Sequence, residues 1–179
     1  MIDRYFPSVR LWVLPEQALH DSLFEMAQDG ARGCEGCVLW LGRRIDGIGE
    51  IKHLVALRGE GVVKLPDYLR IETWLFNEVA DVAIDLGLSI IGQIHTHGPG
   101  CGTRLSPVDR GGGFTIPHYL SVVAPDYGLR PGTRITDCGV HVFEPGYGYR
   151  RLGSEEVLSR LKLPSGPPVP ITTVGRDQA

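Results

Sequence analysis

The chain has 179 residues, of which 42% are hydrophobic and 22% are charged, and its formal net charge is -3. These values are typical of one globular domain that is large enough to bury a hydrophobic core. The small net charge and the lack of Lys/Arg runs argue against a nucleic-acid partner. Apolar stretches fall well short of the roughly 20 residues that a membrane-spanning helix requires, so we expect no membrane segment.

The four cysteines are too few for a disulfide scaffold in a chain of this length, which favours a reducing compartment. The opening residues, MIDRYFPSVRLWVLP, lack the basic, apolar and small-residue regions of a secretory signal peptide. We therefore expect a cytoplasmic protein. Cys34 and Cys37 have the spacing of half a zinc ribbon, but no second Cys-x-x-Cys follows, so we expect them to be structural.

The first half of the chain alternates between helical and strand patterns. Apolar residues at every fourth position predict a helix over residues 15–30, which a glycine ends. Two runs of bulky apolar residues, 37–45 and 49–59, predict strands that the turn-like sequence DGIG joins. A second apolar stripe predicts a long helix over residues 66–87.

The second half is richer in strand patterns. A short helix is expected to open at Ser106, and a last helix is expected over residues 154–163. Further strands are expected over residues 89–97, 118–125, 138–145 and 146–152. We interpret residues 1–163 as a single domain and the Pro-rich residues 164–179 as an irregular or extended tail. The expected fold is α/β of the α+β kind, with a mixed, mostly antiparallel sheet flanked by helices.

His95 and His97 end the strand predicted over residues 89–97. Side chains at positions i and i+2 of a strand point to the same face, and their Cα atoms lie roughly 7 Å apart. Two imidazoles placed in this way can bind one metal ion. The alternative is that both histidines are simply polar residues at the end of a strand.

The sequence Ser106-Pro107-Val108-Asp109 is a typical helix start, with serine at the N-cap, proline at N1 and an acidic residue at N3. The same short helix could bring Asp109 to the histidines as a third metal ligand. Two neutral imidazoles and one carboxylate leave a fourth coordination position open, which is the pattern of a catalytic zinc site. Such a site also requires a general base.

Glu35 is the candidate for that base, because it directly precedes the apolar strand predicted over residues 37–45. The alternative is a solvated glutamate in a loop between a helix and a strand. Sequence alone leaves both interpretations open.

In combination, Glu35 before the sequence GCVLWLG, then His95-Thr96-His97, then Ser106-x-x-Asp109 resemble the JAMM (JAB/MPN-plus) zinc metalloproteases. Their pattern is a glutamate, a distant His-Ser/Thr-His, a gap of seven residues and Ser-x-x-Asp. The resemblance covers about residues 15–150 and points to a compact, prokaryotic-type member. It implies an MPN/JAB-like fold with the layering of cytidine deaminases.

The resemblance also implies a function. Active members use Zn²⁺ to hydrolyse the bond after the C-terminal glycine of ubiquitin or a ubiquitin-like protein. By this resemblance His95, His97 and Asp109 would bind zinc, Glu35 would be the general acid/base and Ser106 would stabilise the oxyanion. The implied partners are a ubiquitin-like or sulfur-carrier protein as substrate and E1/E2-like proteins of the same pathway.

The sequence departs from the family pattern in two places. Eight residues, Gly98 to Leu105, separate His97 from Ser106 where the family has seven. Gly98 follows the second histidine, where a proline is common in the family. Both differences lie in a glycine-rich loop, which can bulge outward without moving its ends.

Three other interpretations use similar residues. A mononuclear iron enzyme also has two histidines and one carboxylate, but it requires neither Glu35 nor Ser106. A metallo-β-lactamase requires His-x-His-x-Asp-His, but Pro99 and Gly100 occupy the last two places. A non-catalytic MPN scaffold usually lacks one or more ligands, whereas all five positions are filled here. The remaining buried-looking histidines, His53 and His141, are expected to be structural.

Overall fold

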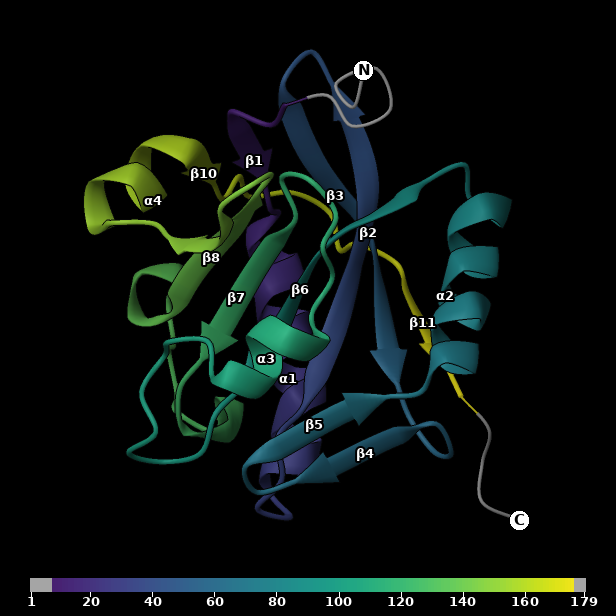
Figure 1. Cartoon of the computed structure of the whole chain (residues 1–179). Coiled ribbons are helices and arrows are strands. Elements are labelled where there is room, and N and C mark those ends of the chain that lie inside the picture. The colour runs from purple at the N-terminus through teal and green to yellow at the C-terminus, as the bar shows by residue number, and fades with distance from the viewer. Residues whose placement is uncertain (1–7, 176–179) are drawn as a thin grey trace.

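The structure is a computed structural model, and it describes residues 8–175. Within these residues, nine strands form a curled sheet in the order β10-β1-β3-β2-β6-β7-β8-β9, in which β11 also pairs with β3 (Figure 1). The strands of this sheet are β1 (Leu11–Val13), β2 (Cys37–Ile45), β3 (Ile48–Leu57), β6 (Ser89–Thr96), β7 (Leu120–Ala124), β8 (Gly139–Glu144), β9 (Gly148–Arg151), β10 (Leu161–Lys162) and β11 (Ile171–Val174). A separate two-stranded sheet consists of β4 (Val62–Leu65) and β5 (Tyr68–Ile71). The helices are α1 (Glu16–Gly30), α2 (Thr73–Asp85), α3 (Pro107–Gly112) and α4 (Ser154–Arg160), with two 3-10 turns, η2 (Asp126–Gly128) and η3 (Ile135–Asp137).

The expected mixed sheet with flanking helices is confirmed. Among the described strands of the main sheet, four neighbouring pairs are antiparallel and four are parallel. The expectation that most pairs are antiparallel is therefore wrong for this sheet. The parallel pairs arise partly because β1 and β11 both join the same edge of β3, and neither of these short strands was predicted.

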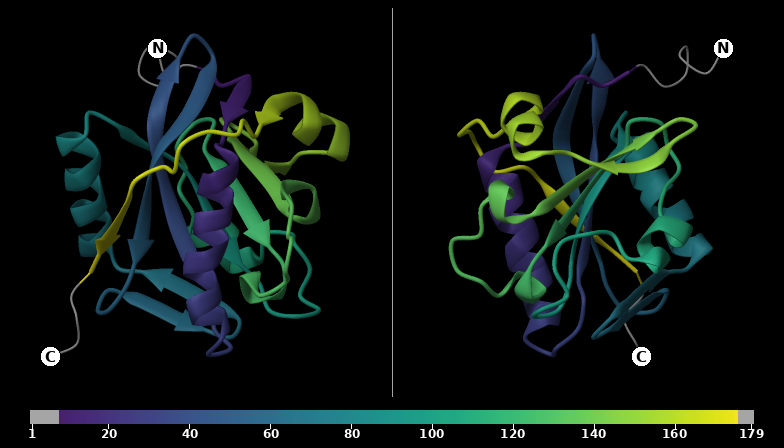
Figure 2. Two further views of the ribbon diagram at one scale, coloured as in Figure 1. Left: turned by 180° about the vertical axis from the view of Figure 1, so that it is seen from behind. Right: turned by 60° about the vertical axis from the view of Figure 1, so that its left-hand side comes forward.

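Helix α1 covers one face of the sheet (Figure 2). It buries Leu19, Leu23 and Met26 in a hydrophobic cluster that also contains Trp40 of β2. The indole N–H of Trp40 donates to the Ser22 hydroxyl at 3.1 Å, so the one polar atom of this large buried ring is satisfied. The helix spans residues 16–30, as predicted.

Helix α2 lies on the opposite face, where Leu75, Val79 and Ala83 pack against buried residues of β2 and β3. The two apolar clusters sandwich β2, whose residues from Cys37 to Leu41 are all buried. A strand buried on both faces has a continuous apolar run, which explains the sequence CVLWL. None of the helices within residues 8–175 is both long and apolar enough to cross a membrane.

The long helix predicted over residues 66–87 is wrong in its first part. The chain forms a hairpin here, in which Val62 pairs with Ile71 and Leu65 pairs with Tyr68, and α2 begins only at Thr73. Pro66 and Asp67 form the two-residue turn between the strands. Bulky residues such as those of Tyr68–Ile71 favour a strand. They were assigned to a helix because the helical apolar pattern of the residues that follow was extended back over them.

The C-terminal segment also differs from the prediction. Helix α4 ends at Arg160 instead of residue 163, and the next two residues pair with β1 as β10. Within the Pro-rich residues 164–179, which were expected to be irregular or extended, Ile171–Val174 form β11 in parallel register with β3. The described part of this segment therefore belongs to the sheet, and the expected boundary at residue 163 does not separate it from the domain.

Strand β11 should contribute to stability through Val174, which is 6% exposed and packs in the cluster beside α2. We expect Val174→Ala to lower the free energy of unfolding by about 2 kcal/mol, because it removes buried methyl groups. The neighbouring Thr173 is exposed, so Thr173→Ala should change stability by less than about 0.5 kcal/mol. Urea unfolding of both variants measures the difference, and equal stabilities would show that β11 is not packed as described.

Candidate metal centre

The two histidines lie at the end of β6, in the middle of the sheet. His95 faces Cys37 of β2 on one side and Val123 of β7 on the other, and its residue is 1% exposed. His97 follows the strand, donates its backbone N–H to the carbonyl of Ala124 and is 5% exposed. Both side chains are therefore buried where the central strand β6 ends.

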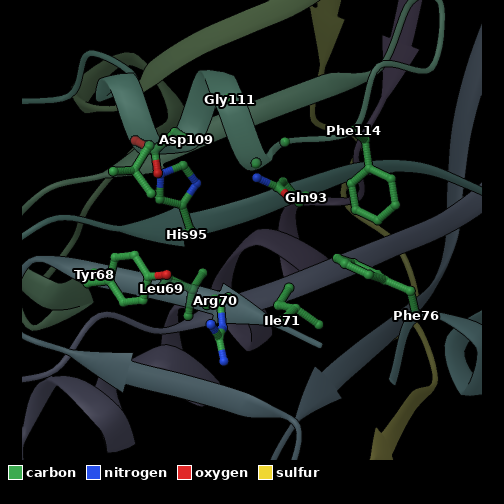
Figure 3. A pocket seen from close by; sticks show the side chains of 13 residues that line it. Tyr68, Leu69, Arg70, Ile71, Phe76, Gln93, His95, Asp109, Gly111 and Phe114 are labelled. Carbon is green, nitrogen blue, oxygen red and sulfur yellow. The ribbon is translucent and has the colours of Figure 1, made fainter. Parts of the chain in front are cut away.

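Helix α3 places Asp109 opposite the histidines (Figure 3). The Asp109 carboxylate lies with Oδ2 at 3.2 Å from Nε2 of His97 and with Oδ1 at 3.6 Å from Nε2 of His95. One ligand atom from each of these three residues lies within 4.8 Å of the others. The structure thus brings together the three residues that the sequence nominated as metal ligands.

The chemistry of this group fits a metal ion. Both ring nitrogens of His95 are buried and have no hydrogen-bond partner, because 3.6 Å is too long for a hydrogen bond to Asp109. A buried polar atom without a partner is costly, and coordination of one nitrogen to a cation removes that cost. Neutral imidazole nitrogens and a carboxylate oxygen are also common ligands of zinc and of iron(II).

The pKa values of Asp109 and His97 are shifted in opposite directions. Burial opposes ionisation of Asp109, but the two histidines and the N–H of Ser106 outweigh it and keep the pKa of this carboxyl well below its usual range. Burial also opposes protonation of His97, yet the hydrogen bond with Asp109 and its charge raise the pKa of the imidazole. Because a metal ion binds the unprotonated imidazole, metal binding and protonation of His97 compete at this position.

The loop from Gly98 to Leu105 orients the His97 ring. The Nδ1 atom of His97 lies 3.1 Å from the carbonyl of Gly102, so Nδ1–H donates to it and Nε2, which faces Asp109, is directed to the candidate metal position. Gly100 and Gly102 both have positive φ values, of 81° and 73°, which explains the glycines of this loop. The role of Gly102 was not predicted, because a contact through a carbonyl leaves no signature in the residue type.

Ser106 caps helix α3, which confirms the structural interpretation of this residue. Its hydroxyl accepts from the N–H of Asp109 at 3.1 Å, and its own N–H donates to Oδ2 of Asp109 at 2.7 Å. This reciprocal capping box fixes the Asp109 carboxylate on the side of the histidines. Whether the same hydroxyl stabilises an oxyanion stays a prediction.

Glu35 lies in the segment between α1 and β2 and is 6% exposed. The next residue, Gly36, exchanges two hydrogen bonds with Thr96, at 2.8 and 3.0 Å, so Glu35 is brought beside the histidines on either side of Thr96. Burial raises the pKa of the Glu35 carboxyl to about 7, with His97 opposing the rise and Asp109 and Asp67 adding to it. A carboxyl with this pKa can both accept and donate a proton near neutral pH.

A groove of about 400 Å³ leads to His95 and Asp109 (Figure 3). One wall is strand β5, and the other is α3 with Gly113, which follows it. Gln93 and His95 lie between the two walls, and the far end is closed by Phe76 and Phe114, whose rings meet edge to face at 4.8 Å. The sequence interpretation missed the β5 wall, because it assigned these residues to a helix.

The other singled-out residues are structural. Cys37 is buried beside β6, and burial raises its pKa to about 12, so it stays a neutral thiol. His53 hydrogen-bonds to the Thr172 hydroxyl of β11 at 2.8 Å. His141 is buried in β8, and burial lowers its pKa to about 4, which keeps it neutral. Neither histidine belongs to the metal-ligand group of the described residues.

Comparison with known proteins identifies the fold and no activity. No family model and no curated protein matches the chain. The solution structure of a protein from Desulfitobacterium hafniense aligns with a TM-score of 0.65 at 17% identity, covering 87% of this chain and 94% of that one. A protein from Salinibacter ruber aligns with a TM-score of 0.50 at 19% identity, covering 80% and 89% of the two chains. Each is a structural genomics target, and the likeness shows a shared fold alone.

We expect the purified protein to bind about one zinc ion per chain and His97→Ala to lose it. Changes in residues around zinc ligands already cost 10- to 100-fold in affinity, so loss of a ligand should cost more than about 100-fold. Elemental analysis after dialysis and titration calorimetry measure this. His20→Ala is the matched control, because His20 is exposed on α1. Iron instead of zinc in the wild type, or zinc retained by His97→Ala, would contradict the assignment.

Proposed function

We propose that this chain is a JAMM-type, zinc-dependent peptidase or isopeptidase, which cuts after the C-terminal glycine of a ubiquitin-like or sulfur-carrier protein. The observation that carries the proposal is the group of the buried His95 and His97 and the half-buried Asp109, with Glu35 in the neighbouring segment. The ligand atoms of His95, His97 and Asp109 lie within 4.8 Å of one another, and burial raises the pKa of Glu35 to about 7. A metal site next to a carboxyl of this kind is suited to hydrolysis.

His95, His97 and Asp109 would hold the zinc ion, which would supply Lewis acidity to activate water near neutral pH and to polarise a scissile carbonyl. Glu35 accepts the proton of the attacking water and delivers it to the departing amine, so one carboxyl serves both steps. Its buried position excludes bulk water, and its raised pKa keeps both protonation states accessible. No covalent intermediate with the protein is required.

Ser106 has a second proposed role beside its role as a helix cap. Its hydroxyl accepts a hydrogen bond from Asp109, and its own O–H proton is not used by that bond. A hydroxyl donor directed at the substrate would stabilise the negative charge that develops on the carbonyl oxygen. We propose this role from the resemblance to the JAMM pattern.

The groove supports the choice of substrate. Gly111 and Gly112 line the α3 wall, so this part of the wall carries no side chains, and a Cβ atom added at either position would have no heavy atom within 4 Å. An extended tail that ends in Gly-Gly has no side chains to clash there. The edge of β5 offers backbone groups with which such a tail could pair as an added strand. The folded body of the modifier would bind outside the groove, together with partners of an E1/E2-like pathway.

Glu35→Gln should keep the fold and the zinc but lose hydrolysis. The amide cannot accept the proton of the attacking water, whereas the three ligands remain, so kcat should fall by roughly 10²–10⁴-fold. Glu60→Gln is the control, because Glu60 is exposed and distant in sequence from the ligands. A Glu35→Gln protein that turns over at the wild-type rate would show that another group is the base.

The tail specificity can be measured with two fusions of a cognate ubiquitin-like protein to a peptide, one joined through Gly-Gly and one through Ala-Ala. We expect cleavage after the final glycine of the first and at least about tenfold slower cleavage of the second, because added Cβ atoms crowd the groove. Free peptides should also be poor substrates, since they lack the binding energy of the folded body. Equal rates for the two fusions would contradict this specificity.

A further inference from the structure

Tyr127 has an unusual backbone conformation close to the candidate metal centre. It lies in the 3-10 turn η2 after β7, with φ of 55° and ψ of 21°, and the preceding Asp126 has φ of 54°. Two consecutive non-glycine residues in the left-handed region are uncommon, and such conformations gather at functional sites. Contacts of the surrounding structure must therefore keep Tyr127 in place.

Those contacts join three separate parts of the chain. The backbone N–H of Tyr127 donates to the carbonyl of His97 at 2.8 Å. Its phenol hydroxyl donates to the carbonyl of Pro66, in the turn of the β4–β5 hairpin, also at 2.8 Å. Its ring covers Gly98, where an added Cβ would lie only 2.7 Å from the hydroxyl oxygen. Tyr127 thus links the end of the histidine strand to the hairpin turn.

The same turn is hydrogen-bonded to Glu35. The backbone N–H of Glu35 donates to the carbonyl of Leu65 at 2.9 Å, so two consecutive carbonyls of the turn accept from Tyr127 and from Glu35. The hairpin is therefore held at this end between the segment that carries Glu35 and Tyr127, whose backbone N–H donates to the carbonyl of His97.

The hairpin depends on such clamps because it does not pair with the main sheet in the described part of the chain. Its base is packed through Val62, Leu69 and Ile71, but an isolated two-stranded hairpin is at best marginally stable in water. On the other side of the turn, Lys64 is paired with Asp29 at 2.7 Å. The position of the turn, and with it the β5 wall of the groove, therefore depends on a few contacts: the backbone bond from Glu35, the hydroxyl of Tyr127 and the Lys64–Asp29 pair.

We propose that Tyr127 is a positioning residue, whose hydrogen bond to Pro66 keeps the hairpin turn against the metal centre and thereby fixes Glu35 through the carbonyl of Leu65. The assignment of Glu35 as the base in this statement rests on the proposed hydrolase function, whereas the clamp itself does not. Gly98 is required for this position of Tyr127, because a larger residue there would displace the Tyr127 ring.

Tyr127→Phe tests the proposal, since it removes the hydroxyl and keeps the ring and the backbone. Loss of one hydrogen bond should raise amide exchange of residues 62–71 and of Glu35 about 3- to 10-fold. Zinc stoichiometry should stay unchanged, because no ligand is touched. For the Gly-Gly fusion, kcat should fall by a similar factor and KM should change less. Tyr147→Phe is the matched control, because Tyr147 is 85% exposed and lies in the β8–β9 turn.

Gly98→Ala is the second variant and should raise exchange in the same amides by displacing the ring. Wild-type exchange of the hairpin in either variant would overturn the clamp, whether or not the protein hydrolyses any substrate. Raised exchange with unchanged kcat in Tyr127→Phe would overturn the link to Glu35. A wild-type protein without hydrolytic activity would instead contradict the proposed function, and the exchange experiment would still decide on the clamp.

Discussion

The pair of hydrogen bonds between Gly36 and Thr96 is the contact on which the candidate site depends. It joins residues 60 positions apart and continues the antiparallel register of β2 and β6, in which Cys37 faces His95. Because Thr96 lies between the two histidines and Gly36 follows Glu35, this single contact sets the proposed base beside the proposed ligands. The buried β2, packed on both faces by α1 and α2, gives that register little freedom to slip.

The two carboxyls near this contact, Glu35 and Asp109, have pKa values shifted in opposite directions. Glu35 and Asp109 are both partly withdrawn from water, yet the pKa of Glu35 is raised and that of Asp109 is lowered. The difference comes from their partners: two histidines and the Ser106 N–H stabilise the charge on Asp109, whereas burial dominates at Glu35. Two carboxyls whose environments push their pKa values apart are a common basis for dividing acid–base work from charge stabilisation.

The sequence predicted the parts of the molecule that local patterns encode. The i, i+2 spacing of His95 and His97 and the capping box of Ser106 and Asp109 each fit within a few residues, so their geometry follows from one strand and one helix start. The hairpin of β4 and β5 and the strand β11 were missed because their evidence is tertiary. Strand β11 exists through pairing with β3, and Pro-rich composition concealed its four β-prone residues. The carbonyls of Leu65, Pro66 and Gly102 act through the backbone, which residue types do not reveal.

Different contacts hold the two walls of the groove in place. The three ligands belong to the end of β6 and to α3, where ladder hydrogen bonds and the capping box set their positions. The β5 wall belongs to a hairpin outside the main sheet, and its turn is bonded to the backbone of Glu35. Movement of this wall would therefore change the width of the groove and the position of Glu35 together. It would leave the spacing of His95, His97 and Asp109 unchanged, so under the proposed function metal affinity and groove geometry respond to different parts of the chain.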